Sequence, residues 1–150
     1  MIMTKAFTTF VCVYTAFCWT LFGVSARSVT PEFEPYVKEY YRKVEANCHP
    51  DDYNSSPFYQ IKFKPQVDGI IGLCYQKING YRIEIDPDWW NDPWRTEADR
   101  KQLMDHELAH CVIYRPHSDN AQHYMYPSHV NLSEQVENAQ VLEDIVNRCN

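Results

Sequence analysis

The chain has 150 residues, which is enough for one ordinary domain and too few for two. It carries 14 Lys and Arg against 20 Asp and Glu, a formal net charge of −6, and no run of basic residues with interleaved aromatic side chains. This composition argues against nucleic acids and anionic membrane surfaces as partners. We expect one mildly acidic domain that is a monomer.

The N-terminal segment has the features of a signal peptide. Residues 6–24 contain no charged side chain, Lys5 precedes them, and a small-x-small cleavage pattern ends at Ala26. We predict a signal peptide over residues 1–26 and a mature domain over residues 27–150, secreted to the extracellular or periplasmic space and free of the membrane after cleavage. An uncleaved anchor is the alternative, because the uncharged stretch approaches the length that spans a bilayer.

The mature domain begins with a predicted helix and a loop. In residues 31–47, apolar and aromatic side chains recur at the spacing of one helix face: Phe33, Val37, Tyr40, Tyr41 and Val44. Residues 48–57 are rich in Pro, Asp, Asn and Ser, which is typical of a loop.

Three strands are predicted next. Residues 58–67 alternate between polar and apolar side chains, as a half-buried strand does. Residues 70–76 and 81–86 flank Asn79-Gly80, a pair that favours a tight hairpin because both residues tolerate positive φ. One face of the last strand carries its apolar side chains: Tyr81, Ile83 and Ile85. We expect this face to meet the core.

A turn-rich segment and a helix follow the strands. Residues 86–94 contain three tryptophans, which we interpret as packing residues. A helix is predicted over residues 97–114, with a capping pair at Thr96 and Asp99, and Pro116 ends it.

The last predicted helix covers residues 132–148. Its apolar side chains are expected to face inward: Val136, Ala139, Val141, Leu142 and Ile145. Together the elements predict an α+β fold, in which a small mixed or antiparallel sheet packs on the helix over residues 97–114 and the C-terminal helix lies beneath.

The motif His106-Glu107-Leu108-Ala109-His110 indicates the chemistry of the chain. Histidines four residues apart on a helix point the same way and can bind one zinc ion. In such a site the glutamate does not bind the metal; it acts as general base toward a zinc-bound water and passes the proton to the leaving amine. We therefore predict one zinc ion at His106 and His110, with Glu107 as the catalytic residue.

A catalytic zinc ion needs a third protein ligand and an open fourth position. The candidates after the helix are His117, Asp119 and His123. We favour His117, because it directly follows Pro116, where the chain can leave the helix and turn back toward the metal.

These residues resemble the metzincin zinc peptidases, most of all the matrixin branch, in the stretches His106-Glu-Leu-Ala-His110, His117-Ser-Asp-Asn and Met125-Tyr-Pro-Ser. The resemblance covers under half of the mature chain. It implies a zincin-like fold, a methionine-containing turn beneath the metal at Met125, and an extended polypeptide substrate along a sheet edge. It also places Tyr126 where a tyrosine supports the transition state in some branches; the alternative is a packed aromatic residue.

The chain departs from the family pattern at one point. In metzincins the third histidine lies six residues after the second, with a glycine midway. Here the interval from His110 to His117 is seven residues, and Ile113 occupies the glycine place. The extra residue and Arg115-Pro116 must make the turn by another route.

Four cysteines lie in the mature domain: Cys48, Cys74, Cys111 and Cys149. In an oxidising compartment they are expected to form disulfides, and four cysteines allow three pairings. We favour Cys74–Cys111, which ties a central strand to the active helix, and Cys48–Cys149, which ties two terminal helices. A cysteine zinc site is disfavoured because no pair has the short spacing of such sites.

The sequence therefore predicts a secreted zinc metalloendopeptidase that cleaves polypeptides. The alternative, from a different class, is a catalytically silent, zinc-stabilised extracellular binding or structural module. An intact Glu107 favours the enzyme, because a site that only holds metal needs no general base beside it.

Overall fold

The computed structural model describes residues 27–128 and 130–150, so the predicted signal segment over residues 1–26 lies outside the described residues. The described part is α+β. Its elements in chain order are β1 (Arg27–Val29), η1 (Pro31–Phe33), α2 (Glu34–Asn47), β2 (Tyr59–Phe63), β3 (Gly72–Lys77), β4 (Gly80–Ile85), α3 (Pro87–Trp90), α4 (Glu97–Val112) and α5 (Glu134–Cys149). None of the described helices is both long and apolar enough to cross a membrane.

The strands form a mixed sheet in the order β1-β2-β4-β3, which confirms the predicted small sheet. Strands β1, β2 and β4 are parallel, whereas β3 runs antiparallel to β4. Strand β3 pairs with β4 alone among the described strands and is therefore an edge strand. The three-residue strand β1 was not predicted, because so short a segment has no alternating pattern to recognise.

The predicted hairpin forms between β3 and β4, but its turn lies one residue earlier than expected. The strands pair up to Lys77 and Gly80, so Ile78 and Asn79 make the turn. Asn79 makes this turn without adopting a positive φ. Gly80 is required for a different reason: a Cβ atom there would overlap the carbonyl oxygen of Phe58, directly before the neighbouring strand β2.

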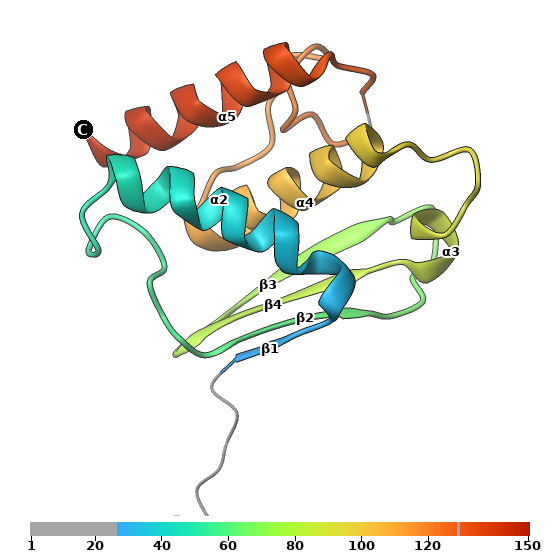
Figure 1. Cartoon of the computed structure of the whole chain (residues 1–150), viewed down its shortest axis with the longest axis horizontal. Helices are drawn as coiled ribbons and strands as arrows, with labels where there is room; N and C mark the ends of the chain where they lie inside the picture. The colour runs from blue at the N-terminus through green and yellow to red at the C-terminus, as the bar shows by residue number, and fades with distance from the viewer. Residues whose placement is uncertain (1–26, 129) are drawn as a thin grey trace, which may run out of the picture.

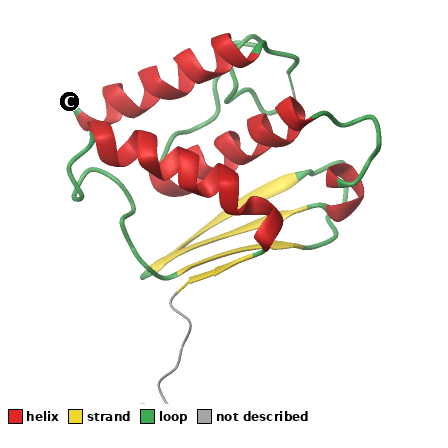
Figure 2. Cartoon of the chain, in the orientation of Figure 1, coloured by secondary structure: helices red, strands yellow, loops and turns green. Residues whose placement is uncertain are grey.

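Helices α2 and α4 cover one face of the sheet, and α5 packs on these two helices from the far side (Figures 1 and 2). The shared core is apolar, and its fully buried side chains come from every layer: Val37, Tyr40 and Val44 of α2, Ile61, Ile83 and Ile85 of the sheet, Met104 and Leu108 of α4, and Val141 and Ile145 of α5. The inward faces predicted for the first helix and for β4 are confirmed.

The predicted inward face of the last helix is wrong in part. Val136, Ala139 and Leu142 are exposed. Their places are taken by two buried acidic residues, Glu137 and Asp144. Each carboxylate faces a basic side chain, with Lys101 Nζ 2.9 Å from Glu137 and Arg115 Nε 2.9 Å from Asp144. The buried face of α5 is therefore rotated about the helix axis relative to the face that its apolar residues alone predicted.

Both disulfides have the predicted pairing. Cys74 of β3 is bonded to Cys111 of α4, and Cys48, directly after α2, is bonded to Cys149 at the end of α5. The first bond fixes the edge strand to the helix that carries the histidine motif. The second joins residues 101 positions apart in sequence, which greatly restricts the unfolded chain.

Candidate metal centre

Helix α4 presents the two motif histidines side by side. It begins with a full capping box between Thr96 and Asp99, as predicted. One turn of helix then separates His106 from His110, and their Nε2 atoms lie 3.1 Å apart. Both imidazoles are half-buried and point into the same space.

A left-handed turn at Tyr114 brings the third histidine back. Helix α4 ends at Val112, two residues before the predicted end, and Tyr114 has φ 58°. The Arg115 N–H then returns to the carbonyl of Ala109 at 3.0 Å. The chain therefore reverses with a tyrosine in the conformation that favours glycine, one residue after the glycine place of the family pattern.

The three histidines His106, His110 and His117 are close enough to bind one metal ion. Their ligand atoms all lie within 4.8 Å of one another. No other group of three His, Cys, Asp or Glu side chains meets this condition in residues 27–128 and 130–150. The two alternatives for the third ligand, Asp119 and His123, lie outside the group; the His123 ring nitrogens face the Met125 N–H and the carboxylate of Asp144.

Backbone carbonyls fix the tautomers of the two helix histidines. His106 Nδ1 lies 2.8 Å from the carbonyl oxygen of Tyr124, and His110 Nδ1 lies 2.6 Å from that of Arg115. A carbonyl only accepts, so each Nδ1 carries the hydrogen and each Nε2 keeps a free lone pair for a metal. Burial lowers the pKa of both imidazoles, that of His106 to about 4, so both are neutral at pH 7.

Glu107 lines the same cavity but is held by the edge strand. Its side chain is only 4% exposed. The carboxyl group lies against Gly72, where a Cβ atom would come 2.7 Å from Oε1, and it accepts the backbone N–H of Cys74. Burial outweighs this hydrogen bond and raises the pKa of Glu107 to about 8.

Met125 and Tyr126 belong to a turn that is bonded to both sides of the histidine group. Met125 is fully buried, and its carbonyl accepts the N–H of Ser118 at 2.9 Å, next to His117. The residue before it supplies the carbonyl that holds His106. Tyr126 is half-buried and lines the cavity. The turn therefore positions two of the three imidazoles through its backbone.

Sequence reasoning missed several supporting groups. Gln76 of β3 donates to the carbonyls of His110 and Cys111 at 2.8 and 3.2 Å, which caps the end of α4. Gly72 could have been found, because an isolated glycine in a strand marks a close approach. The carbonyls of Arg115 and Tyr124 leave no signal in sequence, because any residue type supplies one.

The three histidines and Glu107 line a cavity of about 920 Å³. From this group the cavity runs along α4 toward the start of the helix, past Gln102 and Leu103, and reaches Trp89 and Arg95. Strand β3 and the segment before it form the opposite wall, over residues 68–74. The space is therefore a cleft between an edge strand and the motif helix.

Neither family models, nor curated proteins, nor solved structures give a match to this chain. The likeness to metzincins therefore rests on the quoted residues, chiefly His106, Glu107, His110, His117 and Met125.

Proposed function

We propose that the chain is a secreted zinc-dependent metalloendopeptidase. The observation that carries this proposal is the meeting of three imidazoles, each able to offer a lone pair, with the buried carboxyl group of Glu107 in one cleft. The two disulfides support export, because such bonds persist in oxidising compartments. A polypeptide is the proposed substrate, and one zinc ion is the proposed cofactor.

The donor set fits zinc. Three imidazole nitrogens with an open fourth position are a typical catalytic zinc environment. Two ligands of a tetrahedral zinc ion lie roughly 3.3 Å apart, given zinc–nitrogen distances of about 2.0–2.1 Å. The Nε2 atoms of His106 and His110 are 3.1 Å apart, close to that spacing. When bound by His106, His110 and His117, zinc would act as a Lewis acid that lowers the pKa of water to about 7.

Glu107 is proposed to carry the proton. Its carboxylate takes a proton from the attacking water and delivers it to the amine that leaves. Burial alone raises the pKa of Glu107 to about 8, and the charge of a bound zinc ion would favour the carboxylate form that acts as the base. Gly72 and the N–H of Cys74 hold the carboxyl group toward the cleft. Tyr126, on the cavity wall, is proposed to donate a hydrogen bond to the oxygen that becomes negative.

The substrate is proposed to lie along β3. This strand has one open edge, and its residues Gly72, Leu73 and Cys74 line the cleft. An extended peptide can pair with such an edge through its backbone, which suits a peptidase that must hold many different sequences.

The decisive experiment compares the parent protein with Glu107→Gln, both with their disulfides formed and one equivalent of zinc. We expect the parent to cleave a mixture of unfolded proteins, a chelator to abolish cleavage, and the variant to bind zinc but lose about 100-fold or more of the rate. Glu143→Gln, an exposed site on α5, is the matched control. Equal cleavage by Glu107→Gln contradicts the mechanism. Zinc binding without cleavage by the parent favours the silent zinc-stabilised module.

A further inference from the structure

Building on the proposed peptidase function, we propose that Arg95 and Gln102 form a subsite that selects a glutamate side chain beside the scissile bond. The subsite lies in the part of the cleft that runs from His106 toward the start of α4. Its polar groups are not needed for binding metal or for moving the proton. We therefore assign these polar groups to substrate binding.

The walls of this part of the cleft suit a long aliphatic stem. Leu103 lies about one turn of helix before His106 and is buried, and it lines the cavity together with Ile71 from the opposite wall. A side chain that enters from the metal centre passes between these two apolar residues. Its end then reaches Gln102 and Arg95.

Gln102 is a buried amide without a partner. Only 5% of its surface is exposed, and its side-chain amide makes no hydrogen bond to residues 27–128 or 130–150, although its nitrogen and oxygen atoms are not fully buried. Because Gln102 lines the cavity, a bound side chain can supply the missing hydrogen bond.

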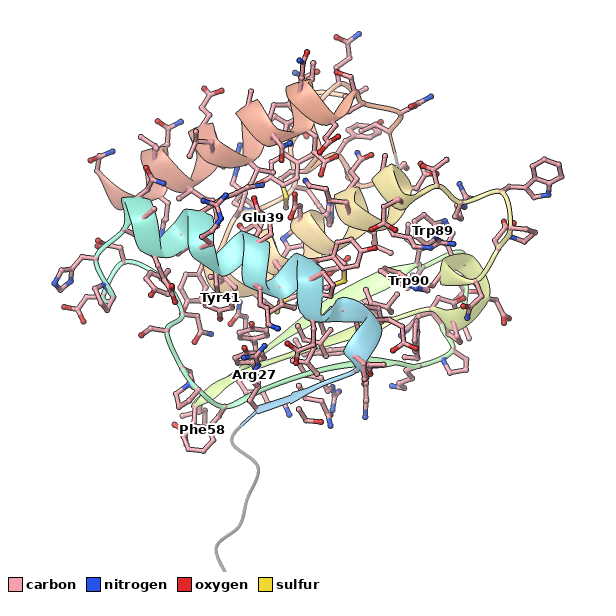
Figure 3. All side chains as sticks on the ribbon, in the orientation of Figure 1. Arg27, Glu39, Tyr41, Phe58, Trp89 and Trp90 are labelled. Atoms are coloured by element: carbon pink, nitrogen blue, oxygen red, sulfur yellow. A yellow bond between two sulfur atoms is a disulfide. The ribbon has the colours of Figure 1, made fainter. Side chains whose placement is uncertain are left out.

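Arg95 supplies a positive charge that is held in place. Its guanidinium lies 4.8 Å from the ring centroid of Trp89, a residue of the short helix α3 that follows β4 (Figure 3). The Arg95 Nε atom is buried and has no hydrogen-bond acceptor among the described residues. Its distance to the carboxylate of Asp92 is 3.9 Å, too long for a hydrogen bond. A carboxylate ligand would complete this site.

The combination favours glutamate over other side chains. Arg95 offers planar N–H donors that match a carboxylate, and Gln102 adds one neutral donor. Aspartate is one methylene shorter, so we expect its carboxylate to bind more weakly. Asp68 also lines the cavity, but it is exposed in a loop, so solvent screens its charge. A lysine preference would mean that Asp68, rather than Arg95, sets the specificity.

The test uses a peptide library that varies the residues flanking the cleaved bond, with cleavage sites read by mass spectrometry. We expect glutamate to be preferred over leucine and lysine by about tenfold or more at one flanking position. Arg95→Gln should remove this preference by slowing cleavage of the glutamate peptides, and Arg95→Glu should shift it to lysine. Arg42→Gln, at an exposed position on α2, should change nothing.

A binding measurement separates this subsite from catalysis. In zinc-loaded Glu107→Gln, calorimetry should show glutamate peptides binding about tenfold more tightly than their lysine counterparts, and Arg95→Gln should abolish the difference. Cleavage without a glutamate preference, or equal binding of the peptides, overturns the subsite and leaves the peptidase function standing. No cleavage of any peptide by the zinc-loaded parent overturns the peptidase function and the subsite with it.

Discussion

The carboxyl group of Glu107 lies against Gly72 of the edge strand, so closely that a Cβ atom on Gly72 would be 2.7 Å from Oε1. A strand residue without a side chain thus makes room for the proposed base. Since the disulfide between Cys74 and Cys111 fixes the same strand to α4, the position of the carboxyl group depends on β3 as much as on its own helix.

Gly72→Ala should therefore displace the base without removing the metal. We expect the peptidase rate to fall about tenfold or more, because small displacements of a catalytic group are costly. Zinc affinity should stay nearly unchanged, since the atoms nearest the new Cβ atom all belong to Glu107. Gly69→Ala is the control: nothing lies within 4 Å of a Cβ atom there, although its φ of 75° adds strain. A fully active Gly72→Ala protein would show that the close packing is unimportant.

The contribution of Glu107 to the stability of the metal-free protein should fall as the pH rises from about 4.5 to about 8, whereas the lowered pKa of His106 acts in the opposite direction between about 4 and 6.5. Burial raises the pKa of Glu107 from 4.5 to about 8, so the folded state holds this proton more tightly than the unfolded state does. The resulting stability is complete below pH 4.5 and is lost as the pH passes through 8; it amounts to at most roughly 5 kcal/mol. Urea unfolding across this range measures it.

Glu107→Gln isolates this effect. Glu137, whose pKa burial raises to about 7, contributes in the same pH window but is present in both proteins. The difference between parent and variant should therefore report Glu107 alone. Zinc should flatten the parent's profile, because a nearby cation favours the ionised carboxylate. Parallel profiles for parent and variant without metal would contradict the buried, protonated state.

Tyr114→Gly should leave the fold intact and stabilise it by up to about 1 kcal/mol, because a left-handed residue with a Cβ atom is strained. The loss of the exposed contact between Tyr114 and Arg148, at 5.6 Å from ring centroid to Cζ, offsets only part of this gain. Thermal unfolding measures the change. Ile113→Gly is the opposite case: its φ is −107° and its side chain is buried, so we expect a loss of about 2 kcal/mol or more. A destabilised Tyr114→Gly protein would mean that the ring, not the backbone, holds the turn.

Tyr126→Phe distinguishes a catalytic hydroxyl from a packed aromatic ring. If the hydroxyl donates to the developing oxyanion, kcat should fall about 10-fold to 100-fold while KM stays nearly constant. The melting temperature should hardly change, since the ring remains. Unchanged kcat would assign Tyr126 to packing alone.

Much of the scaffold could be predicted because its signals are local. The capping pair at Thr96 and Asp99 located the start of α4, and the four-residue spacing placed His106 beside His110. The pairing of the cysteines followed from which elements must lie together. His117 joined the group as expected, although the turn before it is made by Tyr114 rather than by the residues after it.

The rest depends on contacts between distant segments. Glu137 and Asp144 are buried because Lys101 and Arg115 meet them from other parts of the chain, and no periodic apolar pattern reveals such pairs. The tryptophans of the 86–94 segment differ for the same reason. Trp90 packs in the core and Trp89 packs against it, as predicted, whereas Trp94 is 87% exposed; Trp89 also lines the cleft under Arg95.

X-ray absorption at the zinc edge, on protein loaded with one equivalent of zinc, tests the metal centre directly. We predict three imidazole nitrogens and one further light atom at about 2.0–2.1 Å. One imidazole should be lost in His117→Ala and none in Asp119→Ala. A sulfur ligand at about 2.3 Å, fewer than three imidazoles in the parent, or loss of an imidazole-type signal in Asp119→Ala but not in His117→Ala would contradict the three-histidine site.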